Sequence, residues 1–298
     1  MIKHIITLNS SDTESFPKLF QETSDKHNVT SEIVETKKCI LSIGYGDGQA
    51  PVSIVSNNRL LPVNDTAYFI KRTDKDTYRT YLIGRVLQGQ STVFSDEANF
   101  LSDKSADKIT MAAVLPLSGI SVPKSIITTT DSYLDNKKYI SDQIVYPCVV
   151  KKSGSRGQSV WKISNEHELE EKLKQDGELT LIQEYVPNDH DLRVFVLDDK
   201  VVTAIRRSSS DGFYNNVSKG GKAEKIEITD DEKRICIEAT KLAQLRIAGV
   251  DLVRSDKGPL IFEVNKSPQM DIFNEAAGFD VEKFYIEAVV DELMRRSK

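Results

Sequence analysis

The sequence predicts an α/β (α+β) protein, and three features of the chain carry this prediction. Strand-like and helix-like segments alternate over about the first hundred residues, which is typical of a sheet with partly parallel strands. The second half contains two pairs of strand-like segments joined by short turns, one across Asp198-Asp199 and one ending at Gly258. The length of 298 residues is enough for one large unit or for two to three small units with their own cores.

The composition is that of a soluble globular protein, with 39% hydrophobic and 29% charged residues. A net charge of -5 without a long basic block gives no support to a nucleic-acid partner. No apolar run is long enough for a signal peptide or a membrane span. The three cysteines, Cys39, Cys148 and Cys236, are isolated, so we expect small core residues in a reducing interior. The chain is therefore expected to be cytoplasmic, with neither a membrane nor a nucleic-acid partner.

The first 102 residues are expected to form one small α/β domain. The expected elements are strands at Ile2–Leu8, Ala67–Lys71 and Ser91–Phe94, extended segments at Glu32–Ile43 and Val52–Val55, and helices at Phe16–His27 and Tyr78–Leu87. The stretch GYGDGQAP between the two extended segments is rich in glycine but lacks the spacing of a phosphate-binding loop. Because Pro51 follows it where a helix should begin, we expect a surface turn.

A second region, residues 103–182, carries a lysine followed by a Gly/Ser loop. The expected elements are helices at about Ala106–Leu117 and Asn165–Gln175, and strands at Ser125–Thr129, Cys148–Val150, Ser159–Ile163 and Leu179–Val186. A flexible loop whose backbone N–H groups can close over phosphates, beside Lys151, is a candidate nucleotide lid. Taken alone, the motif fits a plain hairpin turn better than a nucleotide lid.

The last region, residues 183–298, contains arginines and two amphipathic helices. The segments Asp191–Leu197 and Lys200–Ile205 are expected to pair as a hairpin, and Arg193, Arg206 and Arg207 on or just after them form a candidate anion-binding cluster. A capping box of Thr229 and Glu232 opens a helix expected over Thr229–Leu245. A further helix is expected over Val281–Met294, with Val281, Tyr285, Val289 and Leu293 on its core face.

A second hairpin is expected between Ala248–Arg254 and Leu260–Val264, around the three-residue loop Asp256-Lys257-Gly258 with Gly258 left-handed. If Ser255 faces Pro259, then Val253 faces Ile261 and Asp251 faces Glu263. Asn265 shares the face of Glu263 and lies opposite Gly249, which has no side chain.

Two carboxylates and one amide oxygen are thus expected to converge on an open spot. Oxygen ligands of this kind suit Mg²⁺ or Mn²⁺, and Mg²⁺ is usually held together with substrate phosphates. The alternative is that Asp251 and Glu263 lie on a solvated sheet face. Their apolar sequence surroundings favour the cation site, because a buried acid without a cation is costly.

Five stretches, taken in chain order, resemble the ATP-grasp superfamily: KKSGSRGQSV, IQEYV, DLRVFVLDDKVVTAIRR, GFYNNVSKGG and AGVDLVRSDKGPLIFEVNKSP. Within it, the chain is most similar to the RimK-like carboxylate-amine ligases, which include glutamate ligases, from about Asp107 to the C-terminus. The resemblance implies an ATP-grasp fold with an N-terminal Rossmann-like pre-ATP-grasp domain. The implied domains are residues 1–102, 103–182 with a lid loop at 153–158, and 183–298, and the nucleotide is expected between the last two.

The resemblance also assigns roles to residues. Those expected to bind the nucleotide are Lys108, Lys151, Ser153, Gly154, Gly157, Glu184, Tyr185, Val186, Asp191 and Asn216. Arg193 and Arg207 are expected near the transferred phosphoryl group, together with Lys219, which replaces a family arginine. Asp251, Glu263 and Asn265 match the metal ligands, in agreement with the hairpin register. Lys266 and Gln269 depart from the family's Ser-Pro-Gly pattern, and Arg156 is an additional arginine in the lid, so the substrate side is expected to differ.

The implied activity is ATP-dependent amide formation through an acyl phosphate, with ATP, two Mg²⁺ or Mn²⁺ ions, and release of ADP and phosphate. Glutamate is the favoured amino-acid substrate, and the acceptor is an amine or carboxylate of a small molecule, peptide or protein tail. A homo-oligomer, dimer or tetramer, is expected. Two alternatives stay open: a tailoring ligase that crosslinks a ribosomally made peptide, and a non-catalytic ATP-binding regulatory protein of the same fold.

Overall fold

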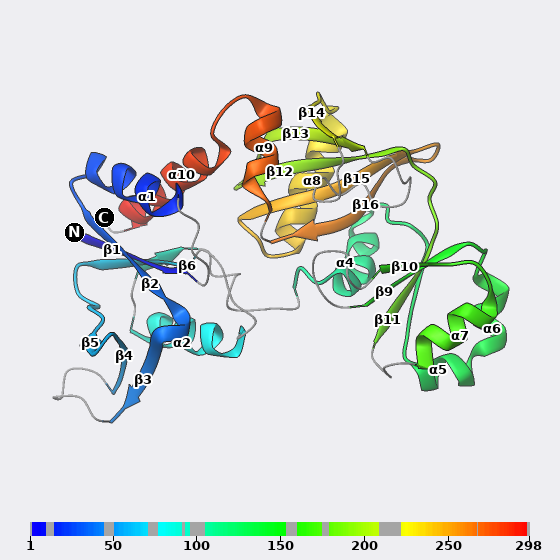
Figure 1. The fold of residues 1–298 in the computed structure, drawn as a ribbon, viewed down its shortest axis with the longest axis horizontal. Helices are drawn as coiled ribbons and strands as arrows, with labels where there is room; N and C mark the ends of the chain where they lie inside the picture. The colour runs from blue at the N-terminus through cyan, green and yellow to red at the C-terminus, as the bar shows by residue number, and fades with distance from the viewer. Residues whose placement is uncertain are drawn as a thin grey trace. The chain divides into compact units, whose positions relative to one another are not determined.

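A computed structural model describes residues 2–9, 15–44, 51–70, 77–90, 93–95, 105–152, 160–174, 179–208, 222–266 and 268–296 (Figure 1). Its internal contacts divide the chain into two compact units. The first unit comprises Met1–Asp103 together with Ala277–Lys298, and the second comprises Lys104–Ala276. Each unit is described by itself.

The first unit is built on a parallel sheet with the strand order β2-β1-β6-β7. Its strands are β1 (His4–Asn9), β2 (Thr30–Glu35), β6 (Thr66–Ile70) and β7 (Val93–Ser95), and its helices include α1 (Ser15–Lys26) and α2 (Thr77–Gly89). Strand β6 is buried along its whole length, as expected for a strand covered on both faces. The prediction of a small α/β unit with a partly parallel sheet is confirmed.

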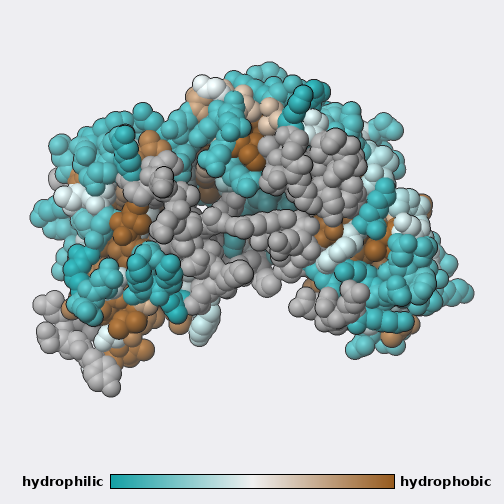
Figure 2. Space-filling model, viewed as in Figure 1, coloured by the Kyte–Doolittle hydropathy of each residue, from teal (hydrophilic) through white to brown (hydrophobic). Residues whose placement is uncertain are grey.

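The extended segment expected at Glu32–Ile43 is interrupted. A 3₁₀ turn, η1 (Thr36–Lys38), separates β2 from β3 (Cys39–Ile43), which pairs with β4 (Val52–Ser56) and β5 (Arg59–Leu60) in a separate antiparallel sheet. The turn buries Thr36 and redirects the chain out of the parallel sheet. Ile40, Ile43 and Leu60 are exposed on the small sheet, and Figure 2 shows hydrophobic surface in the region of β3 and β4. The loop expected within GYGDGQAP lies mostly outside the described residues.

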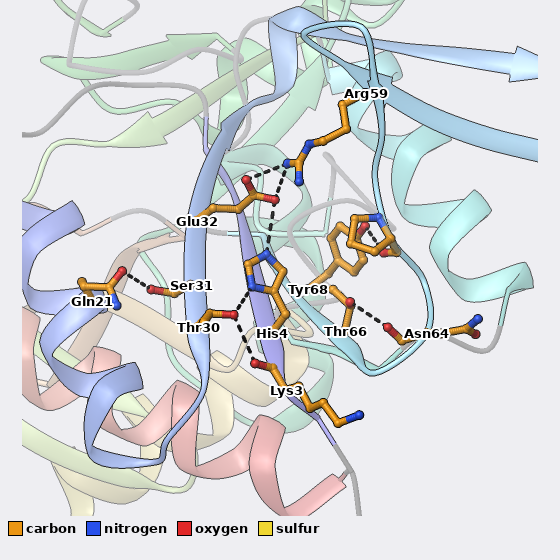
Figure 3. A network of polar contacts seen from close by, with 11 residues as sticks. Lys3, His4, Gln21, Thr30, Ser31, Glu32, Arg59, Asn64, Thr66 and Tyr68 are labelled. Carbon is orange, nitrogen blue, oxygen red and sulfur yellow. Dashed lines mark hydrogen bonds and ion pairs between the residues drawn. The ribbon is translucent and has the colours of Figure 1, made fainter.

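A chain of polar contacts joins the small sheet to the parallel sheet (Figure 3). His4 lies between Thr30, with 2.6 Å from Nδ1 to Oγ1, and Glu32, with 3.3 Å from Nε2 to Oε1. Glu32 accepts two hydrogen bonds from Nη2 of Arg59 on β5. These residues lie toward the amino ends of β1 and β2, and we assign them a structural role.

The last helix, α10 (Val281–Arg296), belongs to the first unit, where it packs against α1. Lys26 pairs with Glu287 at 2.8 Å, and the ring of Tyr285 meets that of Phe69 edge-on at 5.8 Å. Residues 277–298, which belong to the predicted third region 183–298, thus lie in the first compact unit. The apolar face of this helix was predicted correctly, but the sequence does not indicate which core it enters. The other predicted domain boundaries stay predictions.

The second unit contains a central antiparallel sheet with the order β10-β9-β11-β8. Its strands are β8 (Ser125–Thr128), β9 (Cys148–Lys152), β10 (Val160–Ile163) and β11 (Thr180–Glu184). Residues from α5 (Thr130–Asp135), α6 (Lys137–Gln143) and α7 (Glu166–Lys174) form one core with one face of this sheet. The single helix expected at Ala106–Leu117 is instead α4 (Lys108–Val114) followed by the 3₁₀ turn η2 (Leu115–Ser118). Asp107 caps α4, and Pro116 cannot continue an α-helical hydrogen-bond ladder.

The second unit also contains a larger antiparallel sheet with the order β14-β13-β12-β15-β16. Its strands are β12 (His190–Leu197), β13 (Lys200–Ser208), β14 (Lys222–Lys225), β15 (Ile247–Ser255) and β16 (Gly258–Asn265). Helix α8 (Asp230–Leu242) packs on this sheet and begins with the predicted capping box, and α9 (Met270–Ala277) follows β16. All three cysteines are free and buried, as predicted. Within the described residues, no helix is long and apolar enough to cross a membrane.

Candidate active site

Strands β15 and β16 form the predicted hairpin, but with a different register next to the turn. Gly258 has a positive φ of 105°, as expected, yet Ser255 pairs with Gly258 and Val253 with Leu260. Without further change this register would place Phe262 opposite Asp251. A β-bulge between Asp251 and Leu252 shifts it by one residue, so Asp251 faces Glu263 as predicted.

A second β-bulge sets the register of the hairpin β12–β13. The strands meet at Leu197 and Lys200, across the predicted turn. A regular hairpin from this turn would place Arg206 opposite Asp191. A shift between Phe195 and Val196 places Arg207 there instead, on the face that carries Asp191.

The two bulged hairpins assemble a buried cluster of two acids and two arginines, which we call the acid–arginine cluster: Asp191, Arg193, Arg207 and Asp251. Arg193 donates from Nε and Nη2 to the two oxygens of Asp251, both at 2.7 Å. Arg207 donates to the two oxygens of Asp191 at 2.8 and 2.7 Å, and its Nη2 lies 3.2 Å from Oδ2 of Asp251. Such paired geometry satisfies both charges and fixes both side chains.

The arginines stabilise the charge of Asp251, whereas at Asp191 burial outweighs the attraction of Arg207 and raises the pKa of the carboxyl above its ordinary value. Burial by itself would raise the pKa of the Asp251 carboxyl, but Arg193 and Arg207 hold it at about 2. Burial opposes the charge of Arg207 as well, yet Asp251 and Asp191 raise the pKa of its guanidinium above the ordinary value. Arg207 is only 2% exposed, so this arginine orients the two acids. Its predicted place beside the transferred phosphoryl group stays a prediction.

Two lysines approach this cluster from the central sheet and from α4, and we call them the lysine pair: Lys108 and Lys151. Lys108 is buried at the start of α4, which packs against β16. Burial and repulsion from Lys108 lower the pKa of Lys151 to about 8, against the attraction of Glu263 and Asp251. The ammonium group of Lys151 lies 5.2 Å from the ring centroid of Phe262. A site that holds two cations close together is suited to an anion.

The segment predicted to hold the base follows β11. The N–H of Glu184 donates to the carbonyl of Lys124 at 2.9 Å, and its carboxylate accepts from the N–H of Lys124 at 2.8 Å. Tyr185 lies under the ammonium group of Lys162, 4.0 Å from ring centroid to Nζ. Val186 is partly buried beside it. Glu184 is thus fixed by Lys124, and its role in holding the base stays a prediction.

The open spot expected beside Gly249 is filled. A Cβ atom added at Gly249 would lie 3.0 Å from Cβ of Pro268 and 3.7 Å from Cδ of Arg193. Pro268 therefore lies over Gly249, and this close approach favours glycine, because a Cβ atom would force Pro268 to shift. From the sequence we expected the space beside Gly249 to be open for a ligand, but Pro268 occupies it.

The donor set of the predicted metal site fits a hard cation. Asp251 and Glu263 are cross-strand neighbours, and Asn265 is the neighbour of Gly249 on the same face. The amide of Asn265 fits best with its nitrogen toward Oε1 of Glu263 and its oxygen toward Nη2 of Arg193, each at 3.3 Å. These are three oxygen donors of the type that Mg²⁺ and Mn²⁺ prefer. In this structure the guanidinium of Arg193 provides the positive charge beside Asp251.

The described residues contain no group of three or more His, Cys, Asp or Glu side chains that could hold a metal, because here the third donor is an amide. Ser153, Gly154, Gly157, Asn216 and Lys219 were predicted to belong to the site and lie outside the described residues.

Two features of the site were not found from the sequence. The first is the pairing of Asp251 with Arg193, which lie opposite each other on β12 and β15. The alternation of apolar and charged residues along both strands indicates that Arg193 and Asp251 each lie on one face of a sheet. It does not indicate that these two strands are neighbours, so the pairing also requires the strand order. The second is Phe262, whose unpaired position at the bulge has no local sequence signal.

Solved structures of the same fold are ATP-grasp ligases. A structure of the ATP-grasp ligase PsnB complexed with minimal precursor superposes with a TM-score of 0.68 and 20% identity, covering 100% of this chain and 99% of that one. PsnB complexed with a phosphomimetic variant of minimal precursor, Mg and ADP gives a TM-score of 0.69 at 19% identity, covering 98% and 99%. At these identities the similarity shows the fold, which is the ATP-grasp fold.

Sequence comparisons identify the family. The family model described as "RimK-like ATP-grasp domain" matches residues 105–289. A probable alpha-L-glutamate ligase of Haemophilus influenzae (strain Rd) is 34% identical over 261 residues, covering 84% of this chain and 85% of that protein. A probable alpha-L-glutamate ligase of Vibrio cholerae (strain O395) is 34% identical over 194 residues, which cover 62% of this chain and only 64% of that protein. The chain belongs to the RimK-like ATP-grasp ligase family, as its sequence motifs predicted.

Proposed function

We propose that this protein is an ATP-dependent carboxylate–amine ligase that forms an amide bond through an acyl phosphate. The observation that carries the proposal is the alignment of Asp251 with Glu263, and of Asn265 with Gly249, beside the lysine pair. Three oxygen donors for a cation thus lie next to two lysines suited to phosphates. Membership of the RimK-like ATP-grasp family supports the same reaction.

In the proposed reaction a substrate carboxylate attacks the γ-phosphate of ATP, and ADP leaves. An amine then attacks the acyl carbon, phosphate leaves, and the amine loses its proton. Lys151 and Lys108 offset the charge of the phosphates. Asp251, Glu263 and Asn265 would hold Mg²⁺ or Mn²⁺, proposed as two ions, which when bound supply charge neutralisation at phosphate oxygens. Arg207 holds Asp191 and Asp251 in place.

Glutamate is the proposed amino-acid substrate, because the two relatives above are named as probable alpha-L-glutamate ligases. The proposed acceptor is an amine or carboxylate on a small molecule, a peptide or a protein tail. A peptide tailoring reaction is the second candidate, because PsnB, which shares the fold, has a structure complexed with precursor peptide PsnA2 and AMPPNP. The oligomeric state is proposed to be a dimer or tetramer, to be measured by light scattering.

The test is ADP release from MgATP with single amino acids, pairs of amino acids and candidate peptides, together with the intact mass of every product. ADP formed only with glutamate, and a product with the sum of the substrate masses less water, would support the proposal. The Glu263→Gln variant should lose this activity, and Glu224→Gln, an exposed control on the same sheet, should keep it. ATP binding without turnover across the whole panel would favour the regulatory binder.

A further inference from the structure

Strand β3 lies at one edge of the small antiparallel sheet of the first unit and carries exposed apolar side chains. In the order β3-β4-β5, it has a described neighbour on one side only. Ile40 is 63% exposed and Ile43 is 66% exposed, although isoleucine is among the residues most often buried. Natural sheets commonly protect such an edge with charges, proline or a covering element, because an open edge pairs with other chains. An apolar open edge therefore indicates a partner.

The register of the sheet shows which backbone groups lie on this edge. The N–H of Gly44 donates to the carbonyl of Pro51 at 3.0 Å, across the end of β3 and β4. In an antiparallel pair every second residue exchanges hydrogen bonds with the partner strand, so the N–H and C=O groups of Ile43 and Leu41 point away from β4. Two donors and two acceptors thus line the edge, which is the pattern that binds one further strand.

A row of apolar side chains crosses the outer face of the sheet beside this edge. Ile40 pairs with Val55, and Val55 pairs with Leu60, so the three share one face. The opposite face carries Ile54 and Leu41, which pack in the core of the first unit. Hydrophobic surface is visible in this region in Figure 2. A strand added to β3 would place an apolar side chain beside Ile40 and extend the row.

The turn η1, at the amino end of β3, brings together three cations and one carboxylate. Lys37 and Lys38 both pair with Glu35, and their side chains are 59% and 52% exposed. Arg79 of α2 donates from Nη1 to the carbonyl of Lys37 at 2.7 Å. This end of the edge attracts an acidic group and repels a basic one.

We propose that β3 is a docking strand for the acceptor, an extended segment of a peptide or protein that carries apolar residues and ends in acidic ones. The segment adds antiparallel to β3, so its carboxyl end lies beside η1 and its acidic groups meet Lys38. The inference rests on the proposed function, because it treats this segment as part of the acceptor. A second copy of the chain fits less well, since Cys39–Ile43 contains no acidic residue to place beside the basic turn.

The test measures fluorescence anisotropy of a fluorescein-labelled peptide of alternating valine and serine that ends in glutamates. It should bind the wild-type protein, and a peptide with lysines in place of the glutamates should bind at least about tenfold more weakly. A third peptide carries N-methyl groups on the serine nitrogens, which point toward β3 when the valines lie beside Ile40. It should lose binding, because it cannot donate to the edge.

Two pairs of variants test the edge and the turn separately. Ile43→Pro removes an N–H of the open edge without breaking a bond to β4 and should weaken binding of the glutamate peptide by about tenfold or more. Ile43→Thr, which keeps this N–H, is the matched control and should bind within about threefold of the wild type. Lys38→Gln should also weaken binding, whereas Lys18→Gln, an exposed lysine on α1, should not.

Equal binding of the glutamate and lysine peptides, or of Ile43→Pro and Ile43→Thr, would overturn the assignment. Light scattering that shows a dimer for the wild type and a monomer for Ile43→Pro would overturn it too, because a second copy then occupies the edge. ADP release from MgATP is measured in parallel. ADP release without docking would overturn this inference alone, whereas docking without ADP release in any mixture would overturn the proposed function and the acceptor role with it.

Discussion

The acid–arginine cluster and the lysine pair lie in the same unit but handle their charges in opposite ways. In the cluster each acid has an arginine at hydrogen-bond distance, and the pKa of Asp251 is held at about 2. In the lysine pair two like charges are brought together, and the pKa of Lys151 falls to about 8. In the first arrangement opposite charges are paired within the protein, whereas in the second two like charges repel each other. Loss of an arginine in the cluster is therefore expected to affect stability most, and loss of a lysine is expected to affect nucleotide-dependent activity most.

The largest expected effect is on stability, in the cluster. Arg207→Met leaves the largely buried side chain of Asp191, which is 17% exposed, and that of Asp251 without this partner, and it should lower the free energy of unfolding by about 3–5 kcal/mol. Chemical denaturation measures it. The control is Arg206→Met, whose side chain is 44% exposed and pairs with Glu224, and it should change stability by about 1 kcal/mol or less. Similar losses of unfolding free energy in Arg207→Met and Arg206→Met would contradict the expected difference between a buried and an exposed arginine.

A double replacement sharpens this point. Adding Asp191→Leu to Arg207→Met removes the stranded acid together with its partner and should restore part of the lost stability. If the loss of stability in the double variant equals the sum of the losses in Arg207→Met and Asp191→Leu, then the two residues do not act as a pair.

The next effect is on activity, in the lysine pair. Lys151→Met should lower the nucleotide-dependent rate by about 10²-fold, because it removes a charge aimed at the phosphates. Stability at pH 7 should not fall and should rise, by up to about 3 kcal/mol, because a charge that burial disfavours is also removed. The control is Lys172→Met, a lysine that lies 3.6 Å from the ring centroid of Trp161, and it should keep the wild-type rate.

A smaller effect is expected at the close approach beside the cluster. Gly249→Ala forces a Cβ to within 3.0 Å of Pro268 and should lower stability by about 1–3 kcal/mol. Thermal melting of the variant measures it. Gly89→Ala, where nothing lies within 4 Å, should be neutral or slightly stabilising. Equal melting temperatures for Gly249→Ala and the wild type would show that the segment after Asn265 yields easily.

The last expected effect is the pH dependence of the lysine pair. Because the pKa of Lys151 is about 8 rather than 10.5, the folded protein binds fewer protons than the unfolded chain between these values. The contribution of Lys151 to stability should thus rise between about pH 8 and pH 10.5. The affinity for ADP should instead fall as the pH rises, by up to about tenfold, because Lys151 loses its charge above pH 8.

The variant Lys151→Arg is the control for this titration, because a guanidinium stays charged throughout this range. Its ADP affinity should not fall between pH 7 and pH 9. A parallel fall in both proteins would assign the titration to another group.

Much of the site could be predicted because its parts have local signals. The turn at Asp198-Asp199 and the glycine at 258 define two hairpins, and alternation along each strand selects the residues of one face. The prediction that Asp251 faces Glu263 is correct although the register near the turn was wrong, since the assumed longer loop and the real bulge both shift the pairing by one residue. Bulges depend on sheet twist and packing, which the sequence does not display.

The sequence by itself indicated many of the strands and helices, because periodicity and turn chemistry are local properties. Its motifs resembled those of the ATP-grasp family and marked the residue types of the site. Only the tertiary structure decided that Arg207 rather than Arg206 meets Asp191, and that Arg193 supplies the charge beside Asp251. It also decided that Pro268 fills the space over Gly249 and that α10 joins the first unit. Each of these depends on which distant segments become neighbours, and burial in that environment then sets the charge that each side chain carries.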